Sequence, residues 1–408
     1  MDETALKVPD AVQPIAATVN LRGVVRRRWD VVVIGAGPAG AVAARQLALR
    51  RFDVLLVDKS QFPRDKVCGC CVNAAAITAL RRAGLGAHFD RTGGRPWRKM
   101  LLGAGPSRAT IDLPQGMALS RRRFDAMLVG AAVDSGVQFL PGTRATLAPT
   151  RGGPRLMTLS DGNSCGQASA SVVLVADGLG GRSLRALGDD VGRVRVADAS
   201  RVGGAVMVDD ACGFYAPGTI HMACGDGGYV GLVRLEDGRL NVAAALDTEL
   251  VRNVGGMAPA VAGIVEQCRW PAVDCLATSP WRGTPRLSRQ RLDPGGRRLF
   301  VLGDAAGYVE PFTGEGIAWS LASALAVTPL ASRAVAGWSP ELGDMWSRRY
   351  RQIFSVRHRM CAGVVSLLRR PRWMAAVASL LGTAPGLVHP VVRALHAPSA
   401  AMEHHSFG

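Results

Sequence analysis

Residues 30–40, DVVVIGAGPAG, constrain the fold of this chain more than any other stretch. Residues 31–34 are β-forming and apolar, which predicts a buried parallel strand. The turn Gly35-x-Gly37-x-x-Gly40 follows directly, and residues 39–49 predict a helix. In such a unit the first glycine makes the tight turn, the second lets a pyrophosphate approach the backbone, and the third lets the helix pack on the strand. The stretch therefore predicts a dinucleotide site at a helix N-terminus.

A second apolar strand supports this interpretation. Residues 53–57, DVLLV, end at Asp58, and Lys59 follows. An acid about 20 residues beyond the glycines binds a ribose hydroxyl in dinucleotide-binding units. A glycine-rich turn of an unrelated α/β protein is the alternative, but it leaves the position of Asp58 unexplained.

Composition narrows the class of protein. The chain has 408 residues, 48% hydrophobic and 20% charged, which is typical of a globular enzyme with two lobes. Its formal net charge of +17 comes mainly from scattered arginines, and we find no nucleic-acid-binding signature. We therefore expect no nucleic-acid partner.

Cysteine usage and the N-terminal residues indicate a cytoplasmic protein. Nine cysteines in 408 residues do not form the pattern of a disulfide scaffold. Residues 1–28 lack the apolar core of a secretory signal, and we expect them to form a flexible tail. We also expect no transmembrane span, because no sufficiently long apolar run occurs. The sequence Cys68-x-Cys70-Cys71 lacks a second ligand pair, so we expect no metal site.

Two further apolar strands end in acid–glycine motifs. One is 172–176 before Asp177-Gly178, and the other is 298–302 before Gly303-Asp304. Ligands of open parallel sheets bind at the carboxyl ends of such strands. We expect a β-meander over 143–176 and a helix over 316–327.

The remaining patterns predict an α/β fold with a second architecture inserted into it. We expect a Rossmann-like, discontinuous nucleotide-binding domain (29–94, 119–200 and 287–335) and an antiparallel substrate domain (95–118 and 201–286). The latter is predicted to hold two short strands over 95–118 and one helix near 257–268. Residues 336–408 are predicted to form a C-terminal helical region.

Together, the three strand-end motifs resemble the flavin-dependent oxidoreductases with the p-hydroxybenzoate hydroxylase type of fold, which use FAD. The stretches 62–69 (FPRDKVCG) and 303–317 (GDAAGYVEPFTGEGI) are most similar to the geranylgeranyl reductase group. This resemblance implies bound FAD, with NAD(P)H as a transient electron donor. It also implies that the N-terminus of the helix after Gly314 points at the flavin, and that Cys68 lies near the flavin ring. The residues implied to bind FAD are Gly35, Gly37, Pro38, Ala39, Gly40, Asp58, Lys59, Cys68, Gly69, Arg121, Ala145, Asp177, Gly178, Gly303, Asp304, Pro311, Gly314, Glu315, Gly316 and Ile317.

The resemblance leaves three functions open. The first is reduction of double bonds in an apolar, isoprenoid- or polyketide-like substrate, with a proton from Cys68 or water. The second is hydroxylation of an aromatic or polyketide substrate through a flavin C4a-hydroperoxide. Against the second, Gly307 stands where monooxygenases of this superfamily commonly have His. The third is a flavin-binding protein without catalytic activity.

Candidate substrate contacts lie in the predicted antiparallel sheet and the C-terminal helices. Tyr229 and Val233 alternate along one strand and are expected to face the substrate pocket. His221 is a weaker candidate, since a lone His on a strand is usually structural. Short apolar helices flanked by arginines, 360–368 and 373–381, predict either packing on the substrate domain or peripheral contact with a membrane surface. The sequence does not indicate an oligomeric state.

Overall fold

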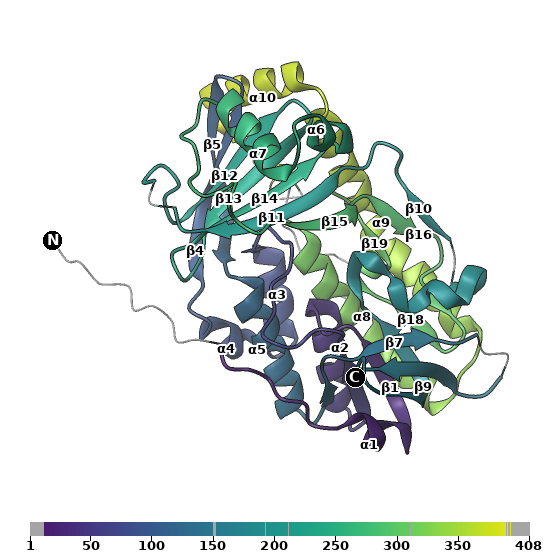
Figure 1. Ribbon diagram of the computed structural model, residues 1–408. Coiled ribbons are helices and arrows are strands. Elements are labelled where there is room, and N and C mark those ends of the chain that lie inside the picture. Colours follow the sequence, from purple (N-terminus) through teal and green to yellow (C-terminus); the bar gives the residue numbers. More distant parts are fainter. Residues whose placement is uncertain are drawn as a thin grey trace.

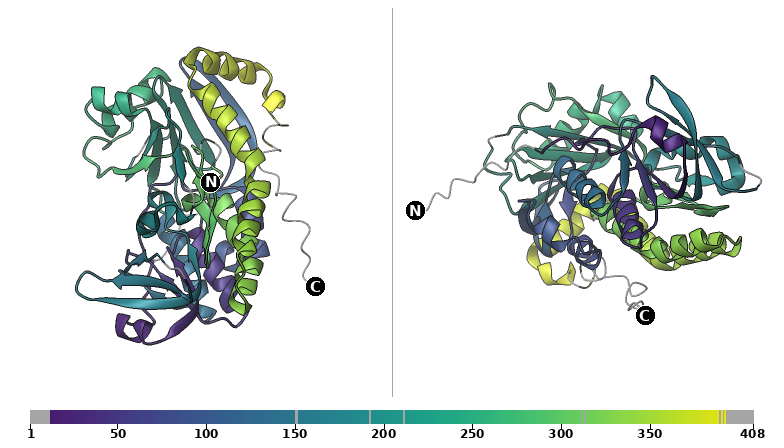
Figure 2. Two further views of the ribbon diagram at one scale, coloured as in Figure 1. Left: turned by 90° about the vertical axis from the view of Figure 1, so that its right-hand side faces the viewer. Right: turned by 90° about the horizontal axis from the view of Figure 1, so that it is seen from below.

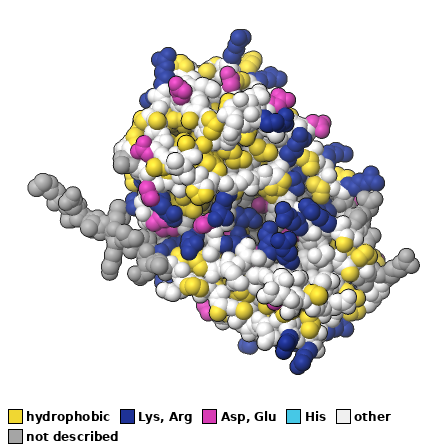
Figure 3. All heavy atoms as spheres, in the orientation of Figure 1, with side chains coloured by type: hydrophobic (Ala, Val, Ile, Leu, Met, Phe, Trp, Pro, Cys, Tyr) yellow, Lys and Arg dark blue, Asp and Glu magenta, His cyan; other side chains and the backbone are white. Residues whose placement is uncertain are grey.

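The computed structural model describes residues 12–149, 152–191, 193–210, 212–310, 312, 314–388, 390 and 392. The chain forms two lobes, with a parallel sheet in one and a large mixed sheet in the other (Figure 1). The helix α9 (Glu341–Leu368) runs along one side of both lobes (Figure 2, left). Lys and Arg side chains gather between the lobes on the face shown in Figure 3. The predicted fold class, α/β with an inserted sheet and a C-terminal helical segment, is confirmed; the inserted sheet, predicted to be antiparallel, also contains one parallel pair between residues 99–104 and 219–224.

The first sheet is a Rossmann-like arrangement whose central strands are parallel. Its strand order is β17-β18-β9-β1-β2-β6, and a β7–β8 hairpin continues from β9. In β1 only Arg28 is exposed, and residues 31–34 are all buried, as expected for a strand that is covered on both faces. The strands are β1 (Arg28–Ile34), β2 (Val54–Val57), β6 (Gln138–Leu140), β7 (Arg144–Leu147), β8 (Arg155–Ser160), β9 (Cys165–Val175), β17 (Gly295–Gly296) and β18 (Leu299–Val301).

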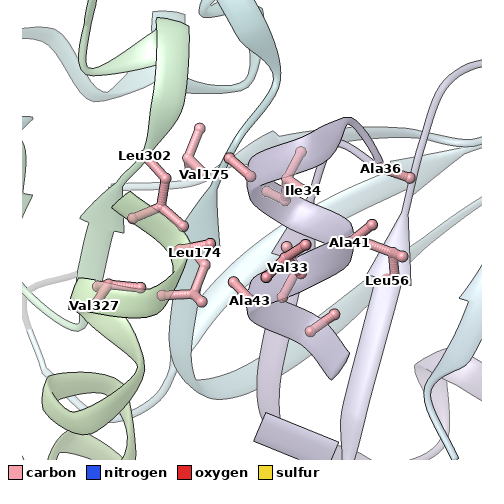
Figure 4. Close-up of a cluster of buried hydrophobic side chains, with 14 of the residues drawn as sticks. Val33, Ile34, Ala36, Ala41, Ala43, Leu56, Leu174, Val175, Leu302 and Val327 are labelled. Atoms are coloured by element: carbon pink, nitrogen blue, oxygen red, sulfur yellow. The ribbon is translucent and has the colours of Figure 1, made fainter. Parts of the chain in front are cut away.

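Helices cover this sheet and complete its core. Figure 4 shows α2 (Pro38–Ala48) packed on β1 through small residues such as Ala41 and Ala43, with Val327 of α8 (Gly316–Ala336) beyond it. Alanines bring the helix close to the strands, which the third glycine of the turn also requires. The helix α8 continues through Pro329 to Ala336, well beyond the predicted end at residue 327. The other helices of this lobe are α1 (Leu21–Val25), α3 (Ala74–Arg82), α4 (Gly86–Asp90) and α5 (Arg121–Asp134), with 3-10 turns η1 (Gly178–Gly180), η2 (Arg182–Val191) and η3 (Gly303–Ala305).

The second sheet has eight strands in the order β15-β11-β14-β13-β12-β4-β5-β3. The hairpin β4–β5 is longer than the two short strands predicted for 95–118, and its turn begins after Ala104. Two helices, rather than the one predicted near 257–268, follow β14. The elements are β3 (Cys71–Val72), β4 (Arg95–Ala104), β5 (Ser107–Ala118), β11 (Val202–Val208), β12 (Thr219–Gly225), β13 (Gly228–Arg234), β14 (Leu240–Leu246), β15 (Arg282–Arg286), α6 (Thr248–Asn253) and α7 (Met257–Gln267).

A small third sheet and a buried ion pair join the lobes. The strands β10 (Val194–Val196), β16 (Arg289–Arg291) and β19 (Gly307–Tyr308) form the sheet. Next to it, Arg201 donates from Nη1 to Oε1 of Glu310 over 2.9 Å, and both side chains are buried. Removing one partner of such a pair would leave a buried charge, so the pair fixes the two lobes together.

The N-terminal residues that the structure describes do not form the flexible tail expected for 1–28. The backbone N–H of Ile15 donates to the carbonyl of Phe62, and that of Thr18 donates to the carbonyl of Phe139. The side chain of Val24 is fully buried and its carbonyl accepts from the indole of Trp29. The segment 12–28 is therefore packed on the domain, because Val24 joins its hydrophobic core and Ile15, Val19 and Leu21 pack against that core.

The C-terminal helices cover the second sheet. The helix α9 is followed by α10 (Pro371–Thr383) and the 3-10 turn η4 (Pro385–Val388). In Figure 1, α10 lies at the outer end of the upper lobe, beside β5. The buried residues of α10 pack with those of β4 and β5 in one apolar cluster. None of the described helices is long and apolar enough to cross a membrane.

Candidate functional site

Four parallel strands bring the predicted acids to one edge of the first sheet. The register pairs Ile34 with Val57 and Val175, and Val175 with Val301, so the four strands end level with one another. The residues that follow them therefore meet. Gly35, Asp58, Asp177 and Asp304 all line one cavity of about 1070 Å³ between the lobes.

The glycine-rich turn leaves the start of α2 open to this cavity. Gly35 has φ of +101°, which favours glycine. A Cβ at Gly40 would overlap the carbonyl oxygen of Gly35, so only glycine lets α2 approach the turn this closely. Gly37 is the N-cap residue and provides no side-chain cap, so the first N–H groups of α2 are available to an anion.

Asp58 is fixed at the end of β2 by backbone hydrogen bonds. Its Oδ2 accepts from the N–H of Ala36 over 2.8 Å, and its Oδ1 accepts from the N–H of Ser60 over 2.9 Å. The first bond links the acid to the glycine-rich turn. The carboxylate is thus held beside the start of α2, as a ribose-binding acid requires.

Basic side chains surround the polar part of the cavity. Nη2 of Arg64 lies 3.6 Å from Oδ2 of Asp58 and 3.3 Å from Oδ2 of Asp125. Arg121 donates from Nε and Nη2 to both oxygens of Asp125, each over 2.8 Å, one helical turn along α5. The positive side chains that line the cavity are Lys59, Arg64, Lys66, Arg121, Arg144, Arg182, Arg185 and Arg282. This charge suits a diphosphate.

The two other strand-end acids have oxygen atoms to offer a ligand. Oδ2 of Asp177 accepts from the N–H and the hydroxyl of Ser183, which holds the loop between β9 and η2. Its Oδ1 is buried, and no hydrogen-bond partner for it occurs within the described ranges. Burial raises the pKa of Asp177 and of Asp304, and for Asp304 the nearby Lys66 and Arg121 partly offset this effect. A ligand hydroxyl that donates a hydrogen bond to Asp177 or Asp304 would stabilise the ionised carboxylate against this effect of burial.

The cysteine loop 68–71 lies where the polar part of the cavity ends. The N–H of Cys70 donates to the sulfur of Cys68 over 3.3 Å, and the Cys70 thiol also hydrogen-bonds to that sulfur. Together with the positive charge of Arg121, these bonds lower the pKa of Cys68 to about 6, against the opposing effect of burial. Burial and the adjacent Cys68 raise the pKa of Cys70 and of Cys71. Cys68 is therefore a thiolate at neutral pH.

The start of α8 faces the same region. Gly314 has φ of +69°, and Gly314, Gly316 and Ile317 line the cavity. Glu315 is buried behind them, where Oε1 accepts from Nδ2 of Asn73 over 3.3 Å. Burial raises the pKa of Glu315 to about 7, although Arg357 acts in the opposite direction. The helix thus presents its positive dipole end to the cavity.

Beyond Cys68 and Gly314 the cavity becomes an apolar lobe between the second sheet and the C-terminal helices. Tyr229 and Val233 of β13 line it, as predicted from their alternation. The hydroxyl of Tyr229 is buried without a hydrogen-bond partner in the part of the chain that the structure describes. The other side chains that line this lobe are Trp97, Met100, Leu102, Ile111, Leu113, Ile220, Met222, Phe312, Val364, Leu367, Leu368, Met374, Val377, Leu381, Leu387, Val388 and Val392.

Most of the predicted site residues line this one cavity. Gly40 and Glu315 lie just behind its wall, and Pro311 lies outside the described residues. The predicted residues that line it are Gly35, Gly37, Pro38, Ala39, Asp58, Lys59, Cys68, Gly69, Arg121, Ala145, Asp177, Gly178, Tyr229, Val233, Gly303, Asp304, Gly314, Gly316 and Ile317. Arg64 and Lys66 were not among the predicted site residues, although both lie in the stretch 62–69 that carries the resemblance. The walls of the apolar lobe were not predicted either, although the alternation of residues in β4 and β5 was an available signal.

His221 lies away from the cavity. Its ring packs among Phe214, Tyr215 and Trp270, and burial lowers its pKa to about 4. It is a neutral core residue. Among the described residues, no group of three His, Cys, Asp or Glu side chains is arranged to hold a metal ion.

Comparisons with known proteins agree with the geometry of the polar part. Residues 28–209 match the family described as FAD binding domain. The chain is 29% identical over 373 residues to a menaquinone reductase of Mycolicibacterium smegmatis, covering 85% of this chain and 86% of that protein. It is 26% identical to a digeranylgeranylglycerophospholipid reductase of Methanosarcina acetivorans, covering 82% and 81%. The solved structure of the flavin-dependent brominase Bmp2 has the same fold, with a TM-score of 0.75, 16% identity and coverage of 91% and 94%.

Proposed function

We propose that this chain, an FAD-dependent oxidoreductase through its FAD binding domain, uses NAD(P)H to reduce carbon–carbon double bonds of an apolar, isoprenoid- or polyketide-like substrate. One observation carries the proposal: the strand-end acids, the basic side chains, Cys68, Gly314 and the apolar side chains of the second sheet and the C-terminal helices all line a single cavity. Its volume of about 1070 Å³ is at the upper end of that of ordinary ligand sites, in keeping with a cofactor and a substrate together. Two relatives named as reductases of isoprenoid compounds support reduction.

FAD fits the residues of the polar part. The open start of α2 would hold the pyrophosphate, and Arg64 and Arg121 would neutralise its charge. Asp58 would bind the adenosine ribose, and Asp304 the ribitol. The buried Oδ1 of Asp177, which has no hydrogen-bond partner among the described residues, is an acceptor available to a hydroxyl of the cofactor. When bound, FAD supplies two-electron transfer between NAD(P)H and the substrate.

The chain supplies orientation, electrostatics and a dry environment. The N–H groups at the start of α8, which borders the cavity, would stabilise negative charge on a flavin bound there. Arg121 compensates the thiolate of Cys68 in the same region. The apolar lobe holds the substrate chain and excludes water, so that a double bond can be positioned at the junction.

The proton for the second substrate carbon is assigned to water. Cys68 is a candidate donor from the sequence, but its lowered pKa favours the thiolate at neutral pH, and a thiolate carries no proton to donate. We therefore propose that Cys68 acts as a charged neighbour of the cofactor. If Cys68 has this role, the rate of substrate reduction does not fall as the pH rises above 6.

An anaerobic reaction tests the proposed reduction. FAD-loaded protein is reduced with NADH or NADPH and mixed with a prenylated quinone, a geranylgeranyl glycerolipid or an unsaturated polyketide lipid. We expect the flavin absorbance to return without oxygen and the product mass to increase by two hydrogen atoms. A matched variant, Val233→Trp, fills the lobe beside the junction and is expected to abolish turnover while FAD content stays unchanged.

Two results would count against reduction. If the flavin stays reduced with every lipid in the absence of oxygen, the proposed reduction is refuted. Oxygen uptake that depends on the substrate, with a hydroxylated product, would instead identify the monooxygenase considered from the sequence.

A further inference from the structure

The outward face of α10 and η4 carries large apolar side chains. Trp373, Leu380 and Leu387 are 61%, 53% and 59% exposed, and Leu387 also lines the edge of the apolar lobe. Trp373 and Leu380 are seven residues apart, so they share one face of α10. Single exposed hydrophobic residues are common, but three large ones in succession on one short segment are not.

The inward face of α10 is apolar as well. Met374, Ala378 and Leu381 are buried, and Met374, Val377 and Leu381 line the apolar lobe. Apart from Arg372, Ser379 and Thr383, the exposed residues of α10 are apolar or small. Burial of the inner face explains the fold, but it leaves the outer face without an explanation.

The charge of the C-terminal segment is of one sign. Residues 345–388 contain eight arginines and no Asp or Glu. Arg370 and Arg372 are exposed at the start of α10, beside Trp373. Arginine side chains next to an apolar face complement an anionic surface that has an apolar interior.

We propose that Trp373, Leu380, Leu387, Arg370 and Arg372, the docking face, bind the surface of an anionic lipid bilayer. Trp373 and the leucines enter the boundary between headgroups and acyl chains, where Trp is favoured. Arg370 and Arg372 bind the phosphate groups. The helix α10 lies in the plane of the surface and does not cross it.

This face would also explain how a lipid reaches the cavity, a part of the inference that rests on the proposed function. The same helix separates the docking face from the apolar lobe, since Val377 lines the lobe and Leu380 is exposed on the outside. A lipid entering beside α10 and η4 would pass from bilayer to cavity without crossing water.

Vesicle sedimentation of the FAD-loaded protein tests the docking face. We use vesicles of phosphatidylcholine alone and of phosphatidylcholine mixed with phosphatidylglycerol. We expect binding to the anionic vesicles, weaker binding at high salt, and little binding to the neutral ones. No binding to anionic vesicles would overturn the proposal.

Two double variants separate the apolar and the charged contributions. For Arg370→Gln/Arg372→Gln we expect the partition coefficient to fall by about thirtyfold, about fivefold for each arginine. For Trp373→Ser/Leu380→Ser we expect a loss of at least about tenfold. Matched controls are Arg81→Gln/Arg82→Gln at the end of α3 and Leu156→Ser on β8, all exposed residues elsewhere. Variants that bind vesicles as tightly as the unmodified protein would overturn the proposal, and FAD content and Tm verify that each variant is folded.

The remaining outcomes distinguish a lipid bilayer from a second copy of this chain as the occupant of the docking face. They also distinguish failure of the docking face from failure of the proposed function. If the protein is a dimer that Trp373→Ser/Leu380→Ser dissociates, and no vesicle binding occurs, a second copy covers the face and the proposal fails. If vesicle binding behaves as expected but no lipid is reduced, the docking face stands and the proposed function fails. If both stand, the double variants lose turnover of a lipid in vesicles but keep turnover of a short, detergent-soluble substrate.

Discussion

The backbone N–H of Cys70 donates a hydrogen bond to the sulfur of Cys68 across 3.3 Å. Cys70 adopts φ of +56°, an unusual conformation for a residue other than glycine, and the loop thereby folds back on itself. The hydrogen bonds from Cys70, followed by the positive charge of Arg121, lower the pKa of Cys68 to about 6. The loop therefore places a negative charge at the junction of the polar part and the apolar lobe.

A thiolate beside oxidised flavin should be visible spectroscopically. We expect a broad charge-transfer absorption at long wavelength in the FAD-loaded protein, lost as the pH falls through about 6 because the thiol form cannot donate charge. Cys68→Ser should lack the band, whereas Cys165→Ser, which changes an exposed cysteine on β9, should keep it. A band that persists in Cys68→Ser would contradict the assignment.

The close approach of α2 to the glycine-rich turn predicts opposite effects for two glycine substitutions. Gly40→Ala would place a Cβ on the carbonyl oxygen of Gly35, so we expect the free energy of unfolding to fall by about 3 kcal/mol or more and FAD binding to be lost. Gly130→Ala in α5 meets no atom within 4 Å and should stabilise the protein by about 0.5–1 kcal/mol. Denaturant unfolding of both variants is the measurement. Equal effects would mean that helix propensity alone determines them.

Removal of the carboxylate at Asp58 should weaken FAD binding without changing the fold. A hydrogen bond to a charged group contributes about 1.5–3 kcal/mol, so Asp58→Ala should raise the Kd for FAD by about tenfold to a hundredfold. Asp53→Asn, at the other end of β2 and in an exposed pair with Arg27, is the control and should bind FAD normally. Fluorescence titration with FAD distinguishes them. An unchanged Kd in Asp58→Ala would place the ribose elsewhere.

Buried Glu315 should make stability depend on pH. Its pKa is raised in the folded protein to about 7, so its protonated form stabilises the fold below the ordinary pKa of Glu, and this contribution is lost as the pH rises through about 7. The difference is on the order of 3 kcal/mol between about pH 4 and pH 8. Glu315→Gln should remove that dependence in unfolding experiments at saturating FAD. The same slope in both proteins would show that another group titrates.

Filling the outer end of the apolar lobe should discriminate between substrates by length. Val377→Trp adds a large side chain where α10 lines the cavity, so we expect kcat/KM for a long-chain lipid to fall by about tenfold or more and that for a short analogue to change little. Ala362→Trp, on the exposed side of α9, is the control. An equal loss for long and short substrates would indicate that the lobe does not hold the chain.

Local sequence patterns predicted the parts of the site that depend on neighbouring residues. The strand–turn–helix around Gly35–Gly40 and the acids Asp58, Asp177 and Asp304 follow from apolar runs and the residues that end them. Patterns of this kind do not report which distant segments meet. Residues 12–28 were therefore expected to be flexible. The length of β4–β5 was underestimated because the parallel partner of β4 is β12, which lies more than 100 residues later in the chain.

The sequence by itself predicted a dinucleotide site at the glycine-rich turn and, with the resemblance, the residues that would bind FAD. This was possible because the geometry of a glycine-rich turn is imposed within a few residues. Only the tertiary structure decided what surrounds that position. The pKa of Cys68 is lowered first by its neighbour Cys70, but also by the charge of Arg121 from α5, and the apolar lobe depends on packing of α9 and α10 against β4 and β5. Electrostatics and cavity shape arise from contacts between segments far apart in the chain, so no local pattern could have specified them.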